Sequence, residues 1–136
     1  MSFGAHYQYQ KAIPVLSEGV YDIVLAEPFE TTVGNYPVLR FPFLVKGMKE
    51  EVRPNYFDLF DCTDPNDKDK REMFQKNASR ILDCFGMAGA EHFPPYAAFT
   101  GREGRVEIKK SKSGFTNVSS FYPKYPDGVE NNNYFN

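Results

Sequence analysis

The stretch "CTDPNDKDKREMFQKNASRILDCFGM", residues 62–87, decides the fold because its apolar residues recur with a helical period. The residues that share one face of this helix are Phe74, Ala78, Ile81, Leu82 and Phe85. Asp64 and Pro65 supply an N-cap and a first-turn proline, and Gly86 follows the end. The stretch therefore predicts one helix in the middle of a chain of 136 residues.

Segments with the period of two that strands have flank this helix on both sides. They are "GVYDIVLAEPF" (19–29), "PVLRFPFLVKG" (37–47) and "VRPNYFDLFD" (52–61) before it, and "GRVEIKK" (104–110) and "GFTNVSSFY" (114–122) after it. "TTVGNY" (31–36) is predicted to be a turn, and Pro42 predicts an edge position or a bulge because proline donates no ladder hydrogen bond. Three strands, a helix and two strands is the element order of the OB-fold. The sequence thus predicts a mostly β fold, a closed or nearly closed five-stranded OB-fold barrel with one helix between strands 3 and 4.

The length of the chain fits one domain with two extensions. Residues 1–17 are a predicted extended N-terminal arm, residues 18–122 the OB-fold domain, and residues 123–136 a polar C-terminal tail. No apolar run approaches the ~20 residues of a membrane span, and the first residues lack the apolar centre of a signal peptide. These features predict a cytoplasmic protein with no membrane partner.

The last predicted hairpin, "RVEIKKSKSGFTNVSSF" (105–121), concentrates positive charge. The whole chain carries a net charge of −2, whereas residues 101–125 carry +4 from six basic and two acidic residues. A three-residue loop, Lys112-Ser113-Gly114, with the glycine in a left-handed conformation, places Val106 and Ile108 on one face with Val118. The opposite face then collects Arg105, Lys109, Phe115, Asn117 and Phe121.

Basic and aromatic side chains on one surface suit single-stranded DNA. Lysine and arginine neutralise phosphates, and aromatic rings stack on bases of any sequence. OB-folds hold oligonucleotides on their second and third strands, so the predicted DNA-binding residues are Arg40, Lys46, Arg53, Tyr56, Arg105, Lys109, Lys112, Phe115 and Phe121. The alternative is that Phe115 and Phe121 cover the helix or the N-terminal arm, and that the charged segment is a solvated face.

With these residues in view, most of the chain resembles a phage and prophage family of single-stranded DNA-binding proteins, long labelled a domain of unknown function. The similar segments are "EGVYDIVLAE" (18–27), "YFDLFD" (56–61), "FQKNASRILDCFG" (74–86) and "GREGRVEIKKSKSGFTNVSSFYP" (101–123). The resemblance implies an OB-fold, single-stranded DNA as ligand, a place in a replication or recombination module, and no catalysis. Partner proteins from such a module and further copies of the chain stay open.

Three other interpretations are open from the sequence. The segment "DLFDCTD" (58–64) offers ligands for a metal-dependent nuclease, namely Asp58, Asp61 and Asp64. An aromatic face also suits a phage structural or adaptor protein that binds another protein. A zinc site would need ligands whose spacing matches no zinc motif, namely Cys62, Cys84, His6 and His92, so two reduced thiols are the simpler interpretation. The sequence favours DNA binding, with neither catalysis nor a cofactor expected.

Overall fold

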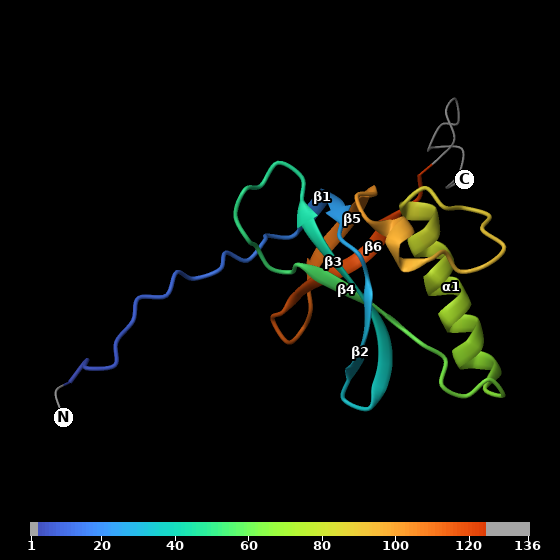
Figure 1. Ribbon diagram of the computed structural model, residues 1–136, viewed down its shortest axis with the longest axis horizontal. Coiled ribbons are helices and arrows are strands. Elements are labelled where there is room, and N and C mark those ends of the chain that lie inside the picture. The colour runs from blue at the N-terminus through green and yellow to red at the C-terminus, as the bar shows by residue number, and fades with distance from the viewer. Residues whose placement is uncertain (1–2, 125–136) are drawn as a thin grey trace.

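The computed structural model describes residues 3–124, which form six strands, one α-helix and a short 3-10 helix (Figure 1). The elements are β1 Gly19–Leu25, β2 Phe29–Val33, β3 Tyr36–Val45, β4 Tyr56–Phe60, α1 Lys68–Cys84, η1 Tyr96–Phe99, β5 Glu103–Lys110 and β6 Thr116–Tyr122. The predicted tail lies outside the described residues from position 125 onward. Neither helix of the described range has the length and apolar character that a membrane crossing requires.

The strands form a curled antiparallel sheet in the order β2-β3-β1-β5-β6, and β4 pairs with β3. α1 follows β4 in the chain and packs against β4 and β6 at one side of the curl (Figure 1). The predicted fold class is confirmed, because the protein is mostly β, has an OB-like architecture and carries one helix between two strands of the sheet.

The structure differs from the prediction in strand count and in closure. β2 was expected to belong to a turn, but it is a strand that pairs with β3 around Gly34, whose φ is +60°. Its side chains are mostly exposed, so its sequence lacks the alternation that marks a half-buried strand. The helix therefore lies between β4 and β5. The sheet is a half-barrel, because β4 and β6 share no ladder in the part of the chain that the structure describes.

Pro42 lies where β3 changes its neighbour. β3 pairs with β2 as far as Arg40 and with β1 from Phe43 onward. In the gap between these ladders the Pro42 carbonyl accepts a hydrogen bond from Ala26 N at 2.9 Å. The irregularity expected at Pro42 is therefore a change of partner inside the sheet rather than an edge strand.

The helix begins three residues later than the sequence predicted. Asp67 is the N-cap, and its side chain accepts a hydrogen bond from Lys70 N at 3.2 Å. Asp64 instead closes a turn before the helix, because its Oδ1 accepts a hydrogen bond from Asn66 N at 2.9 Å. Both aspartates have the chemistry of an N-cap, and the local turn decides which of them starts the helix.

The end of α1 packs directly on β5. Phe85, which caps the helix, and Cys84 are both buried, and they lie over Gly104. A Cβ atom at Gly104 would come within 2.6 Å of Phe85 Cε1 and 2.8 Å of Cys84 Sγ. The missing side chain therefore permits the close approach of helix and sheet.

Gly104→Ala is expected to lower the free energy of unfolding by about 1–3 kcal/mol, because the added methyl group overpacks this contact. Gly19→Ala is the matched control, since its Cβ would come no closer than 3.5 Å to the Tyr21 side chain. Urea unfolding followed by circular dichroism measures both variants. Equal stabilities for the two variants would contradict the close packing at Gly104.

The two cysteines should differ in reactivity. Burial raises the pKa of the Cys84 thiol to about 11, whereas Cys62 is partly exposed. At pH 8 only about one Cys84 thiol in a thousand is then a thiolate, the form that attacks a disulfide reagent. We expect a disulfide reagent to label Cys62 in the native protein and Cys84 only after unfolding in urea. Cys62→Ser should remove the fast phase, and rapid native labelling of both thiols would contradict the burial of Cys84.

Candidate nucleic-acid interface

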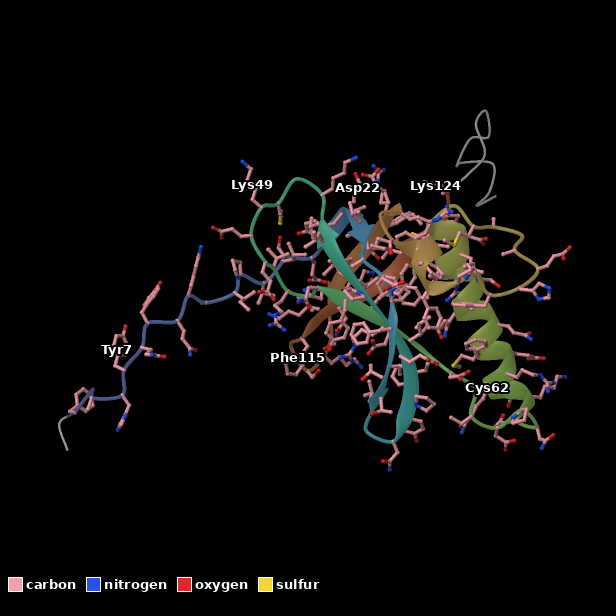
Figure 2. All side chains as sticks on the ribbon, viewed as in Figure 1. Tyr7, Asp22, Lys49, Cys62, Phe115 and Lys124 are labelled. Atoms are coloured by element: carbon pink, nitrogen blue, oxygen red, sulfur yellow. The ribbon has the colours of Figure 1, made fainter. Side chains whose placement is uncertain are left out.

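A cleft opens between the start of β4 and the β5–β6 hairpin. It has a volume of about 570 Å³, with Tyr56 in one wall and Phe115 in the other. Both aromatic side chains are exposed, Tyr56 to 40% and Phe115 to 71%. Figure 2 shows Phe115 at the end of the hairpin. Two exposed rings from elements distant in the sequence thus line one cleft.

Arg40 fixes the position of the Tyr56 ring. Its guanidinium carbon lies 3.9 Å from the ring centroid, as in a cation–π contact. Arg40 also donates two hydrogen bonds to Asp58, from Nε to Oδ1 at 2.8 Å and from Nη2 to Oδ2 at 2.9 Å. These hydrogen bonds hold the pKa of the Arg40 guanidinium above its ordinary value. The guanidinium covers one face of Tyr56, so a ligand ring can stack only on the other face.

The hairpin loop has the predicted length. Ser111 N donates a hydrogen bond to the Phe115 carbonyl at 2.8 Å, which encloses the three residues 112–114. Gly114 has a φ of +91°, a left-handed conformation that glycine adopts without strain. This loop sets the register of the hairpin's outer part, in which Ile108 pairs with Val118. Phe115 consequently points out from the sheet.

Phe121 is not on the predicted outward face. A β-bulge interrupts the ladder, because Glu107 pairs with Ser120 while Ile108 pairs with Val118. The extra residue, Ser119, reverses the sidedness of everything that follows it in β6. The Phe121 ring therefore turns inward and meets the ring of Phe57 edge-on, with 4.9 Å between centroids. The prediction that Phe121 lies on the outward face with Phe115 is wrong for this reason.

Three of the predicted cations do not line the cleft. Each has an acidic neighbour: the pairs are Lys46 with Glu103 at 3.0 Å, Arg105 with Asp22 at 2.9 Å, and Lys109 with Glu107 at 3.6 Å. The hydrogen bond from Arg105 holds the pKa of Asp22 below its usual range. These ion pairs balance the charge around the three cations, so the positive charge of the hairpin sequence is not gathered in one place.

Five of the nine predicted residues come together at the cleft. Arg53, Tyr56 and Phe115 line it, Arg40 lies on Tyr56, and Lys112 is in the adjoining hairpin loop. Arg53 has a carboxylate 3.8 Å away, whereas Lys112 forms no ion pair with any of residues 3–124. The cleft is thus richer in aromatic surface than in free positive charge.

Sequence reasoning missed two half-exposed rings on the same face of the sheet as Arg40 and Asp58, namely Phe29 and Phe60. Phe29 pairs with Arg40 in the β2–β3 ladder, and Phe60 lies two residues beyond Asp58 on the same side of β4. Alternation within β4 could have identified Phe60. Phe29 carried no signal, because the sequence did not mark β2 as a strand.

The carboxylates proposed for a nuclease are not gathered into a metal site. Asp58 is paired with Arg40, Asp61 accepts a hydrogen bond from Cys62 N at 2.8 Å, and Asp64 holds its turn. Within residues 3–124 no group of three or more histidine, cysteine, aspartate or glutamate side chains could hold a metal ion. The nuclease and zinc interpretations therefore gain no support from the geometry.

Comparison of the chain with models of known protein families, and with curated protein sequences, found no match. The resemblance to phage single-stranded DNA-binding proteins accordingly stays a prediction from the sequence. The OB-like architecture and the aromatic cleft are the features from which a function can be inferred.

Proposed function

We propose that the protein binds single-stranded DNA, without strong sequence preference and without catalysis, in the cleft between β4 and the β5–β6 hairpin. The observation that carries the proposal is the pair of exposed rings, Tyr56 and Phe115, in the walls of that cleft. The resemblance suggests the setting, a phage or prophage replication or recombination module in the host cytoplasm.

Stacking on these rings selects single strands. In a duplex the faces of the bases are already stacked on one another, whereas an unpaired base can lie on Tyr56 or Phe115. Every base has such a face, so the contact tolerates any sequence. Arg40 supports this role, because it holds the Tyr56 ring at the cleft from behind.

Positive charge contributes less to the proposed DNA affinity than the sequence alone suggested. Arg53, which lies 3.8 Å from Glu51, and Lys112 in the adjoining loop are the cations proposed to meet phosphates, while Arg40 is neutralised by Asp58. Each phosphate contact on a single strand changes the slope of log K against log salt by about 0.7. Two contacts therefore correspond to a shallow salt dependence, with stacking as the larger source of affinity.

The experiment that tests the function is a fluorescence anisotropy titration with single-stranded and duplex oligonucleotides at two salt concentrations. We expect clear preference for the single strand and a modest loss of affinity at the higher salt concentration. Absence of binding to either probe would refute the proposal and leave an adaptor role, in which a protein occupies the aromatic cleft.

Removal of either ring should weaken binding. Phe115→Ala and Tyr56→Ala are each expected to cost about 1–3 kcal/mol of single-strand affinity, with little change in salt dependence, because stacking releases no counterions. Val20→Ala is the control, since this side chain is half-exposed in β1 and does not line the cleft. Wild-type affinity in both ring variants, with native circular dichroism, would place the DNA elsewhere.

Cations at the cleft and ion-paired cations away from it should affect the salt dependence of DNA binding differently. Lys112→Ala and Arg53→Ala should each flatten the salt slope by about 0.7, because each removes a phosphate contact. Lys46→Ala and Arg105→Ala remove the same charge from side chains that pair with carboxylates and do not line the cleft, so their slopes should stay at the parent value. The opposite ranking would move the binding surface to the β1–β5 ladder, where these ion pairs lie.

A further inference from the structure

We propose that the N-terminal arm, residues 3–14, adds as a β-strand to the free edge of β4 in a second copy of the protein. This interaction is independent of DNA binding. It gives the arm a role and closes the half-barrel of the neighbouring molecule.

The arm leaves the domain and carries uncovered aromatic side chains. After a turn at residues 3–6, residues 7–14 form an extended segment outside the sheet, with Tyr7 far from the folded body (Figures 1 and 2). Tyr7 and Tyr9 are 74% and 77% exposed. Lys11 of the arm forms an exposed ion pair with Glu50 of the folded domain at 2.9 Å. Such a length of exposed apolar surface points to a partner.

The order of side chains in the arm is that of a strand with one apolar face. Tyr7, Tyr9, Ile13 and Val15 share one row of alternate positions, interrupted by Lys11, and the intervening positions hold His6, Gln8, Gln10, Ala12 and Pro14. In an extended strand these two sets point to opposite sides. Only one of the two faces therefore needs to be covered.

The arm cannot reach β4 of its own molecule. Val15 forms a parallel bridge with Arg53, in which Leu16 N donates to the Arg53 carbonyl at 2.8 Å and Arg53 N donates to the Pro14 carbonyl at 2.9 Å. In a parallel arrangement the residues before Val15 run beside those before Arg53. β4 follows Arg53, so the arm is directed away from it. Leu16, which is buried in the core, anchors this direction.

The edge of β4 that could receive the arm faces a groove. One edge of β4 bonds to β3, and the other borders a groove of about 700 Å³ between β4, α1 and β6. Phe43 N donates to the Asn55 carbonyl and Asp61 N to the Pro37 carbonyl, so odd-numbered residues bond toward β3. By alternation, the backbone groups that face the groove are those of Tyr56, Asp58 and Phe60.

The length of the arm suits this edge. The groove beside it is lined by the buried Leu59 and Ile81, by the ring of Phe121, and by polar side chains such as Asn77, Arg80 and Asp83. Ten extended residues span about 33 Å, twice the ~17 Å of a five-residue strand such as β4, so the arm can leave its own domain and cover a neighbouring edge. Reciprocal exchange of two arms gives a closed dimer.

The arm's charge favours a protein partner over DNA. Lys11 is the only lysine, arginine, aspartate or glutamate among residues 3–14, and it already faces Glu50. A segment that followed a phosphate backbone would carry more basic residues. Backbone pairing with a strand edge needs no net charge.

The test compares the full chain with the variant Tyr9→Asp/Ile13→Asp in sedimentation across a concentration series and in NMR amide exchange. We expect the full chain to sediment as a dimer or larger assembly and the variant as a monomer. The amides of Tyr56, Asp58 and Phe60 should exchange at least about tenfold faster in the variant. Gln8→Asp/Gln10→Asp adds the same charge to the solvent side of the arm and should preserve both assembly and protection.

Several outcomes overturn the proposal. A monomeric full chain does so, and so does an arm-dependent assembly in which the three amides stay unprotected, because the arm then binds elsewhere. Dissociation of the assembly in the Gln8→Asp/Gln10→Asp variant would refute the assignment of the buried and solvent-facing sides of the arm. If the Tyr9/Ile13 variant loses affinity for a single-stranded oligonucleotide while sedimenting like the full chain, the arm is a DNA contact. DNA affinity of the full chain is a separate measurement, so failure of the proposed function is distinguishable from failure of arm exchange.

Discussion

The ring of Phe57 is the contact on which the arrangement of the sheet depends. It stacks on Phe41 of β3 at 4.9 Å and on Phe85 at the end of α1 at 6.0 Å, and it meets Phe121 of β6 edge-on at 4.9 Å. β4 and β6 share no ladder in the described range, so ring packing takes the place of hydrogen bonds there. Each such pair contributes about 0.5–1.5 kcal/mol beyond its buried area. The distance between Tyr56 and the hairpin therefore follows from aromatic packing in the core.

The parts of the fold that sequence could predict are those in which burial imposes a period. α1 and the strands around the core have one apolar side, whereas β2 is exposed and left no pattern. The bulge at Ser119 was equally invisible, since an extra serine in β6 looks like any other residue, and it moved Phe121 from the site into the core. The neutralising partner of Arg105, Asp22, is 83 positions away and emerged only from the pairing of β1 with β5.

Paired charges and exposed rings occupy different parts of the outward face of the sheet. Around the β1–β5 ladder, cations and carboxylates lie close enough to cancel one another at short range. At the cleft, the rings of Tyr56 and Phe115 are the exposed features. With a net charge of −2, the proposed binding of a polyanion depends on stacking at these rings more than on positive potential.

The pairing of β1 with β5 also has a consequence for the nascent chain. Their six paired positions are about 80 to 90 residues apart in the sequence. At a translation rate of about 5–20 residues per second, β1 waits roughly 4–18 seconds on the ribosome before β5 has been synthesised. During that time the buried side chains of Ile23 and Leu25 lack the strand that later covers their edge. The protein is thus most exposed to aggregation and to chaperones while it is being made, and the last hairpin ends that period.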